Sequence, residues 1–161
     1  MRIEDDFLSQ EDLDKLDSII SSYHFPWFFQ KNQTWDDDPF FCHVMYCLDM
    51  PESQFYPQVS EIFKKHLNWT SMYRLNVNLV PKIGSTSNFH TDVNEEHNEE
   101  VMTTAIFYLN TNNGYTEFED GSTVDSVQNR LVTFPSSFRH RAVGQTDKDK
   151  RIVLNFNYIG Q

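Results

Sequence analysis

The stretch that decides the fold starts at residue 72 and reads Met72-Tyr73-Arg74-Leu75-Asn76-Val77-Asn78-Leu79. From Tyr73 onward, apolar side chains alternate with one arginine and two asparagines. Side chains point alternately to opposite faces of a β-strand, so this pattern predicts a strand with one apolar and one polar face. In a small protein the polar face lies either at an exposed edge or along a polar cavity. We expect Asn78 to line a cavity, because a His-x-Asp pair follows it closely in the chain.

Four further strand-like segments follow this one, at residues 101–109, 115–118, 130–134 and 151–159. Turn signals separate them, such as Asn-Asn-Gly at 112–114 and Asp-Gly at 120–121. Many short strands without helical periodicity between them predict an antiparallel barrel or sandwich over residues 70–159.

The segment before residue 70 has a different periodicity. Ser9 is a helix-capping residue, and the apolar residues after it recur at helical spacing, at Leu13, Leu16, Ile20 and Tyr23. A second helix is predicted to begin near Tyr56, with Pro57 in its first turn. We expect both helices to buttress the outside of a sheet. Residues 24–40 predict an aromatic loop held against the core, and residues 40–48 predict a strand.

Length and composition indicate one globular domain over residues 1–161, with a helical and loop part at 1–69 and a strand-rich part at 70–159. No apolar run approaches the roughly 18 residues of a membrane span. The acidic start of the chain does not resemble a secretory signal. We therefore expect a soluble, cytoplasmic protein, in which Cys42 and Cys47 are reduced thiols.

The net charge of -11 argues against binding to nucleic acid, which relies on a broad basic surface. Basic residues nevertheless gather in one short region, residues 139–151. The simplest interpretation of this region is a solvated hairpin in which Arg151 alone turns inward.

His90, Asp92 and His140 form the candidate metal site. His90 and Asp92 are two residues apart on an extended segment, so their side chains project to the same side. A distant third ligand, His140, completes a set of two imidazoles and one carboxylate, which holds Fe(II) with about three coordination positions open. Arg151 is predicted to lie on the next strand of a hairpin, with its charge directed into the same cavity, where it suits a dianionic ligand.

This ordered set resembles the iron- and 2-oxoglutarate-dependent dioxygenases. Residues 104–110, Thr-Ala-Ile-Phe-Tyr-Leu-Asn, and residues 130–136, Arg-Leu-Val-Thr-Phe-Pro-Ser, are similar to strands of the prolyl-4-hydroxylase-like branch. The resemblance covers roughly residues 70–159. It implies a mainly β fold of the double-stranded β-helix (jelly roll) type. It also implies hydroxylation of a C–H bond with Fe(II), 2-oxoglutarate and O2, release of succinate and CO2, and stimulation by ascorbate.

By the same resemblance, Arg151 is expected to hold the C5 carboxylate of 2-oxoglutarate, and Tyr108 is the expected second anchor. The alternative interpretation of Tyr108 is a core aromatic of the barrel. Asn78 and Asn155 are further candidates for contact with the co-substrate, since alternation places Asn155 on the same face as Arg151. Arg74 is the first alternative to Arg151.

The resemblance favours a peptidyl substrate, with proline first. Selectivity is expected to come from the aromatic segment 24–40, the acidic segment 93–100 and the polar segment 111–123. A free amino acid or another small metabolite is the second substrate class. Two other classes of protein stay open: a zinc hydrolase, which would leave Arg151 without a role, and a non-catalytic metal-binding domain of cupin type.

Overall fold

A computed structural model describes residues 1–31, 39–82, 84–93 and 102–160. Within these ranges the chain forms two helices and eleven strands. The helices are α1 (Gln10–Ile20) and α2 (Tyr56–Lys64). The strands are β1 (Arg2–Glu4), β2 (Phe28–Lys31), β3 (Pro39–Cys47), β4 (Met50–Pro51), β5 (Trp69–Pro81), β6 (Met102–Tyr108), β7 (Tyr115–Phe118), β8 (Thr123–Asp125), β9 (Arg130–Pro135), β10 (His140–Val143) and β11 (Lys150–Gly160).

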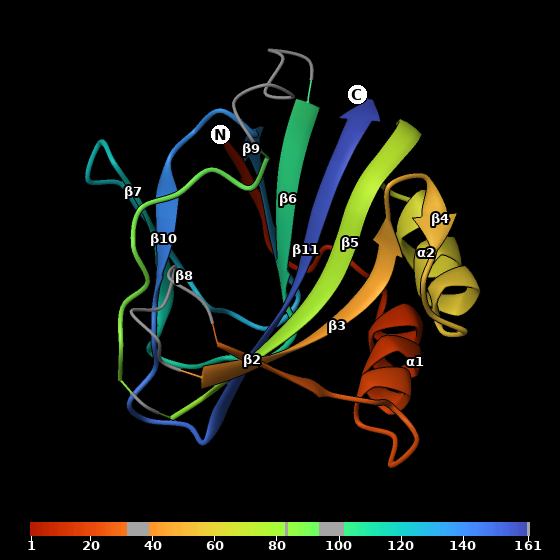
Figure 1. Cartoon of the computed structure of the whole chain (residues 1–161), viewed down its shortest axis with the longest axis horizontal. Helices are drawn as coiled ribbons and strands as arrows, with labels where there is room; N and C mark the ends of the chain where they lie inside the picture. The colour runs from red at the N-terminus through yellow and green to blue at the C-terminus, as the bar shows by residue number, and fades with distance from the viewer. Residues whose placement is uncertain (32–38, 83, 94–101, 161) are drawn as a thin grey trace.

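The strands form two antiparallel sheets that face each other (Figure 1). The larger sheet has the order β1-β9-β6-β11-β5-β3-β2, with β4 attached to β3, and the smaller sheet has the order β10-β7-β8. After β6 the chain alternates between the sheets, because β7, β8 and β10 belong to the smaller sheet and β9 and β11 belong to the larger one. The predicted mainly β, antiparallel architecture is confirmed.

One predicted connection is wrong. His140 and Arg151 were expected on the two strands of one hairpin. His140 instead begins β10, which pairs with β7, whereas Arg151 lies in β11 between β5 and β6. The local turn at residues 145–148 carries the chain from one sheet to the other. His140 and Arg151 therefore approach the space between the sheets from opposite walls.

Helix α1 forms as its capping signals predict. The side chain of Ser9 accepts a hydrogen bond from the backbone N–H of Asp12, and Leu13, Leu16 and Ile20 are buried on one stripe. The prediction for Tyr23 is wrong: the helix ends at Ile20, and Tyr23 is 98% exposed. Periodicity alone could not locate that end, because an apolar residue at helical spacing can lie beyond the last turn, and helix ends are uncertain by one or two residues.

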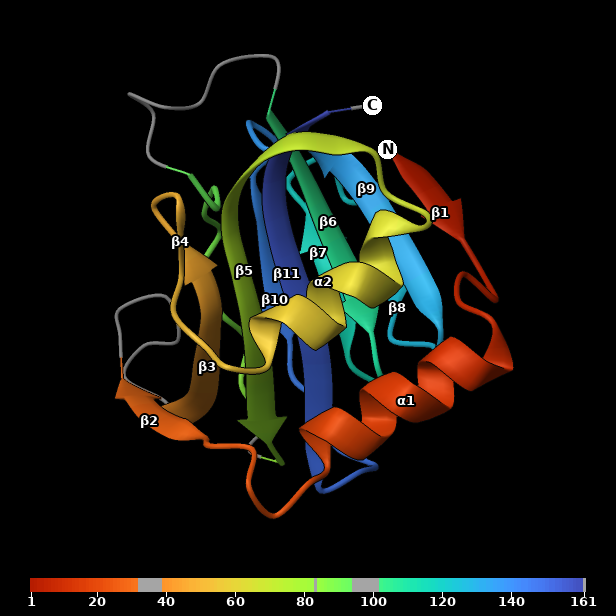
Figure 2. The same ribbon diagram turned by 90° about the vertical axis from the view of Figure 1, so that its right-hand side faces the viewer.

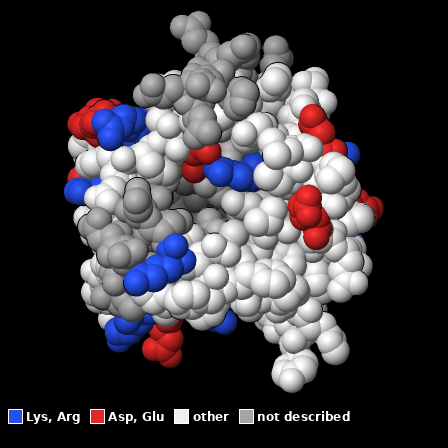
Figure 3. All heavy atoms as spheres, viewed as in Figure 1, with Lys and Arg blue, Asp and Glu red and all other residues white. Residues whose placement is uncertain are grey.

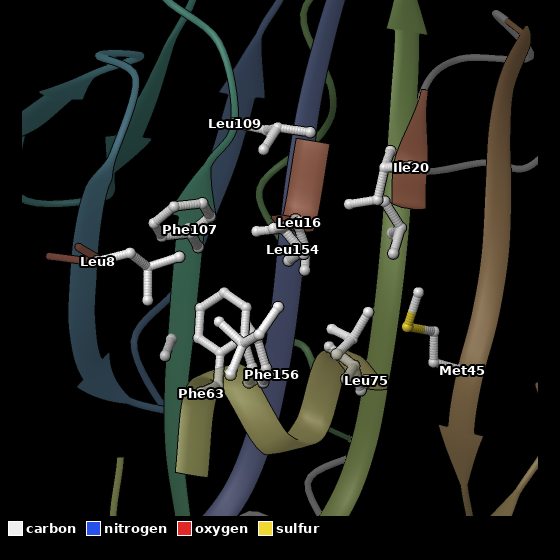
Figure 4. Close-up of a cluster of buried hydrophobic side chains, with 14 of the residues drawn as sticks. Leu8, Leu16, Ile20, Met45, Phe63, Leu75, Phe107, Leu109, Leu154 and Phe156 are labelled. Carbon is white, nitrogen blue, oxygen red and sulfur yellow. The ribbon is translucent and has the colours of Figure 1, made fainter. Parts of the chain in front are cut away.

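Both helices lie across the outer face of the larger sheet, on the side away from the smaller sheet (Figure 2). Helix α2 begins with Pro57 in its first turn and buries Val59, Ile62 and Phe63. Figure 4 shows the resulting layer, in which Leu16 and Ile20 of α1 and Phe63 of α2 meet side chains from the sheet. The sheet contributes chiefly Leu75, Phe107, Leu154 and Phe156. This core fixes one face of β5 and β11, which leaves their other face for the site.

An ion pair joins the two helices. Nζ of Lys65 lies 2.8 Å from Oδ1 of Asp12, whose pKa is lowered from its ordinary value of 3.8, mainly by this hydrogen bond. Asp12→Asn should lower the free energy of unfolding at pH 7 by about 1 kcal/mol, because Lys65 is half exposed and solvent screens the pair.

A lowered pKa means that the carboxylate stabilises the fold fully above its ordinary pKa and loses this effect as the pH falls below it. The difference between Asp12→Asn and wild type should therefore shrink as the pH is lowered from about 5 to 3. Urea unfolding across this range measures it. The control is Asp14→Asn, since Asp14 bonds only Gln10 among the described residues. A difference independent of pH would contradict the prediction.

Residues 24–40 are more regular than predicted. Phe28–Lys31 form the edge strand β2, paired with β3, while Trp27 packs against the core and Phe28 and Phe29 are exposed. Trp35 and the following three residues lie outside the described part of the chain. Cys42 and Cys47 are free thiols, as expected. In the described ranges, neither helix combines the length and the apolar character needed to cross a membrane.

Candidate metal centre and adjoining cavity

The segment that carries His90 runs along β10 (Figure 1). His90 and His140 exchange two backbone hydrogen bonds of 2.9 and 3.0 Å, and a second bridge joins Thr86 to Val143. The backbone N–H of Gly144 donates to the carbonyl of Ser85, and a Cβ at Gly144 would lie 2.6 Å from that oxygen. Glycine is therefore required for this close approach. These contacts bring the predicted ligands together, although they are fifty residues apart.

The three predicted ligands meet at one point. Their donor atoms all lie within 4.8 Å of one another. Nε2 of His140 is 3.7 Å from Oδ2 of Asp92, and Nε2 of His90 is 4.0 Å from Oδ1 of the same carboxylate. Metal–ligand bonds to nitrogen and oxygen are about 2 Å long. An ion placed between the three side chains would span these gaps.

The two histidines are prepared to bind a metal through Nε2. Nδ1 of His90 lies 2.8 Å from the carbonyl oxygen of Asn88, and Nδ1 of His140 lies 3.1 Å from that of Phe138. A carbonyl can only accept, so each Nδ1 carries the proton and each Nε2 keeps its lone pair. Burial, and then the neighbouring His140, lower the pKa of His90 below its ordinary value of 6.5, which favours the neutral ligand form.

Asp92 is held from the side of the larger sheet. Nδ2 of Asn155 donates to both of its carboxylate oxygens at 3.1 Å, and a terminal nitrogen of Arg74 donates to its backbone oxygen at 2.7 Å. Burial acts to raise the pKa of Asp92, but the facing His140 and Arg74 outweigh burial and lower it overall. The carboxylate is thus ionised and oriented at neutral pH.

A cavity of about 530 Å³ opens beside this centre. Figure 3 shows a hollow in the middle of this face of the molecule, in the region between the two sheets. Its volume falls in the range of about 300–1,000 Å³ that is typical of small-molecule sites. The walls come from the polar face of β5, the same face of β11, the outer strands β2 and β3, and the ligand-bearing segment. The residues that line it include Gln30, Phe40, Cys42, Val44, Arg74, Asn76, Asn78, Val80, Ile106, Thr116, Ala142, Arg151, Val153 and Asn155.

Arg151 is a buried cation in this cavity. Nε donates to the hydroxyl of Ser126 at 2.7 Å, and a terminal nitrogen donates to Thr116 at 3.3 Å. No carboxylate in the described chain lies within ion-pair distance of it. Burial lowers the pKa of Arg151, but a guanidinium remains charged at neutral pH. A buried charge with only hydroxyl partners is costly, and a bound anion would supply the missing counter-charge.

The two ends of the site lie on the same strand. Arg151, Val153 and Asn155 alternate along the cavity face of β11, and Asn155 contacts the metal ligand Asp92. Four residues of extended chain span about 13 Å. A short dicarboxylate that bridges the metal and the guanidinium fits this separation, because the Arg151 side chain and the metal–ligand bonds cover part of it.

The other predicted co-substrate residues occupy different positions. Asn78 lies on the same cavity wall as Val153, its register partner on β11, and its buried Oδ1 has no hydrogen-bond partner among the described residues. Tyr108 is fully buried beneath Arg151, with its hydroxyl 2.7 Å from that of Thr116, and does not itself line the cavity. The NH2 group of Asn155 donates to Asp92, and the amide oxygen that remains can only accept a hydrogen bond. Asn155 therefore cannot donate to the carboxylate of a co-substrate.

Within the cluster of basic residues, Arg151 alone is buried, as predicted, while Arg139 and Arg141 form ion pairs at the rim and the two lysines are exposed. Arg139 pairs with Glu119 at 2.9 Å and Arg141 with Glu117 at 2.7 Å. Sequence reasoning missed Ser126 and Thr116, which hold Arg151, and Asn157, which lies beside Asp92. Of these three, only Asn157 could have been found from the sequence, because side-chain alternation along β11 places it on the same face as Arg151 and Asn155. The predicted acidic segment falls largely on residues 94–100, outside the described residues.

The sequence matches no protein-family model and no curated protein. The structure, in contrast, resembles solved oxygenases. A prolyl-4-hydroxylase from Pseudomonas putida matches with a TM-score of 0.63 and 16% identity, over 99% of this chain and 92% of that one. A prolyl hydroxylase from Trichoplax adhaerens, solved with a peptide fragment of hypoxia inducible factor, matches with a TM-score of 0.64 and 16% identity, over 99% and 83%.

A third match is SnoN, a non-heme alpha-ketoglutarate-dependent epimerase of nogalamycin biosynthesis. Its TM-score is 0.70 at 11% identity, over 98% of this chain and 77% of that one. Two of these neighbours are prolyl hydroxylases and the third is an epimerase, so the likeness identifies the architecture and leaves the substrate open. The protein has the fold of the iron- and 2-oxoglutarate-dependent oxygenases, prolyl-4-hydroxylases among them, and the resemblance predicted from the sequence is confirmed at this level.

Proposed function

We propose that the protein is an Fe(II)- and 2-oxoglutarate-dependent oxygenase with a double-stranded β-helix core, which hydroxylates a C–H bond of a peptidyl residue such as proline. The observation that carries this proposal is the pairing of two features in one cavity. A set of two imidazoles and one carboxylate lies at one end, and the buried Arg151, without a carboxylate partner among the described residues, lies at the other. A zinc hydrolase would need only the first feature.

The residues present fit both groups. His90, Asp92 and His140 would hold Fe(II) on one side, and the cavity leaves the other side open to ligands. Arg151 would hold the C5 carboxylate of 2-oxoglutarate through parallel hydrogen bonds, which a lysine could not form. With 2-oxoglutarate and O2, the bound iron supplies the oxidising power that places one oxygen atom in a C–H bond, with succinate and CO2 as co-products.

The remaining side chains orient the co-substrate and exclude water. Thr116 and Ser126 fix the guanidinium of Arg151, and Tyr108 fixes Thr116 through its hydroxyl. Tyr108 therefore acts on the co-substrate indirectly in this proposal. Asn78 is assigned a direct contact through its NH2 group, because it lies between Arg151 and the metal ligands. Asn155 orients the carboxylate of Asp92 through its two hydrogen bonds and does not contact the co-substrate.

The test is 2-oxoglutarate turnover. Purified protein with Fe(II), with and without ascorbate, is expected to form succinate and a product heavier by one oxygen atom when it is given a proline-containing peptide. The matched control is the same peptide with alanine in place of proline. Absence of succinate formation from 2-oxoglutarate, or hydrolysis of model esters with Zn(II) alone, would contradict the proposal.

A small metabolite is the second candidate substrate, and the cavity volume of about 530 Å³ favours it over a bulky partner. Free amino acids and nucleosides, assayed beside the peptides, separate the two classes. Turnover that is coupled only to small molecules would reject the peptidyl substrate and keep the oxygenase.

A further inference from the structure

Arg74 contacts the metal-ligand segment from the opposite sheet. Its Nε donates to Oδ1 of Asn157 at 2.9 Å. A terminal nitrogen donates to the backbone oxygen of Asp92 at 2.7 Å and lies 3.4 Å from its carboxylate Oδ1. One guanidinium thus reaches β11 and the ligand segment together. Nε and one terminal nitrogen are engaged there, which favours Arg151 over Arg74 as the anchor of the co-substrate.

Arg74 also determines how Asn157 faces Asp92. Oδ1 of Asn157 accepts from Arg74, so its NH2 group must point the other way. That group lies 2.9 Å from the hydroxyl of Thr104 and 3.4 Å from Oδ2 of Asp92. Thr104 in turn bonds Ser136 at 2.9 Å. Asn157, Thr104 and Ser136 are buried, so the network is shielded from water and holds one arrangement.

The sheet is built to place these residues opposite each other. Asn157 pairs with Arg74 across β11 and β5, and the register shifts immediately after this pair. Such bulges are common beside active sites, where they redirect a side chain. The side chain of Arg74 is 25% exposed, whereas that of Asp92 is 5% exposed. Arg74 therefore reaches inward to a more deeply buried carboxylate.

We propose that Arg74 is a positioning residue of the metal centre, which holds Asp92 in its ligating orientation through the two-directional fork of its guanidinium. The inference rests on the proposed function, because it takes His90, Asp92 and His140 as the metal ligands. The fork is the essential property: Nε serves Asn157 while a terminal nitrogen serves Asp92. A lysine at this position would keep the charge and reach one partner at a time.

Charge and orientation predict opposite effects on metal binding. A cation beside the site repels a divalent ion, so removing the charge of Arg74 would by itself strengthen metal binding. Loss of an outer partner that orients a ligand typically weakens metal affinity about 10- to 100-fold. The sign of the change therefore distinguishes a positioning residue from a neighbouring charge.

The experiment measures Co(II) binding to the full chain, by calorimetry and by the visible absorption of bound Co(II), without 2-oxoglutarate. Arg74→Met is expected to weaken Co(II) binding about 10- to 100-fold and to change the absorption spectrum. Arg74→Lys is expected to restore little of either. Arg130→Met is the control: Arg130 forms a comparable forked ion pair with Asp5, at 2.6 and 2.9 Å, and does not line the cavity.

Thermal unfolding of each metal-free variant separates folding from positioning. Weaker Co(II) binding in Arg74→Met, with a folded apo-protein and normal binding in Arg130→Met, supports the inference. Unchanged or tighter binding in Arg74→Met, or full rescue by Arg74→Lys, overturns it while the metal site of the proposed function stands. If the wild type binds no Co(II), the metal site itself is wrong and the inference is rejected with it.

Discussion

Asp92→Ala is expected to abolish metal binding and 2-oxoglutarate turnover. The substitution removes the only carboxylate of the candidate ligand set, with its oxygens 3.7 and 4.0 Å from the two imidazole nitrogens. Loss of a direct ligand should exceed the 10- to 100-fold effect that is typical of outer partners, so metal affinity should fall by more than about 100-fold. Calorimetric titration with Fe(II) under anaerobic conditions, and a succinate assay, measure the two losses.

The same substitution should also lower the free energy of unfolding, by about 1–3 kcal/mol, because it leaves the amide of Asn155 without its acceptor and removes the carboxylate that lies 3.4 Å from Arg74. Asp92→Asn separates these effects, since it keeps the shape of the side chain and removes its charge. Asp5→Asn is the control at an exposed ion pair outside the cavity. Metal affinity in Asp92→Ala close to that of wild type would remove Asp92 from the ligand set.

Arg151→Met is expected to raise the concentration of 2-oxoglutarate needed for half-maximal turnover by more than about 100-fold, with metal binding nearly unchanged. Hydrogen bonds to charged groups contribute about 1.5–3 kcal/mol each, and the guanidinium would supply two to the C5 carboxylate. Among the described residues, Arg151 hydrogen-bonds to Ser126 and Thr116 and to none of the three metal ligands. Its loss therefore separates co-substrate binding from metal binding.

The metal-free Arg151→Met protein should unfold at nearly the wild-type denaturant concentration. Removing a buried cation relieves its desolvation cost, which offsets the hydrogen bonds lost at Ser126 and Thr116. In the wild type, 2-oxoglutarate with the metal should raise the unfolding temperature, because it binds the folded state alone. This increase should be absent in Arg151→Met and present in Arg130→Met. An equal increase in all three proteins would place the anion site elsewhere.

Features that depend on a local sequence pattern were predicted more accurately than the ends of elements. The alternation of residues 73–79 predicted a strand with a polar face, and that face of β5 lines the cavity. The side chains of His90 and Asp92 meet at one point, although Asp92 lies in a bend and not in a regular strand. Helix α1 was predictable because its cap and its stripe are local signals. The end of that helix was not, and Tyr23 was misplaced.

The sequence by itself determined the mainly β class, the two helices and the inward-facing side chains of β5 and β11, because each depends on periodicity within one segment. Only the tertiary structure decided which strands pair. The move of the chain between sheets after His140, the contact of Arg74 with Asp92 and the hydroxyl partners of Arg151 all join residues far apart in sequence. Such contacts are fixed by the burial of whole sheets against each other, and no local pattern encodes their partners.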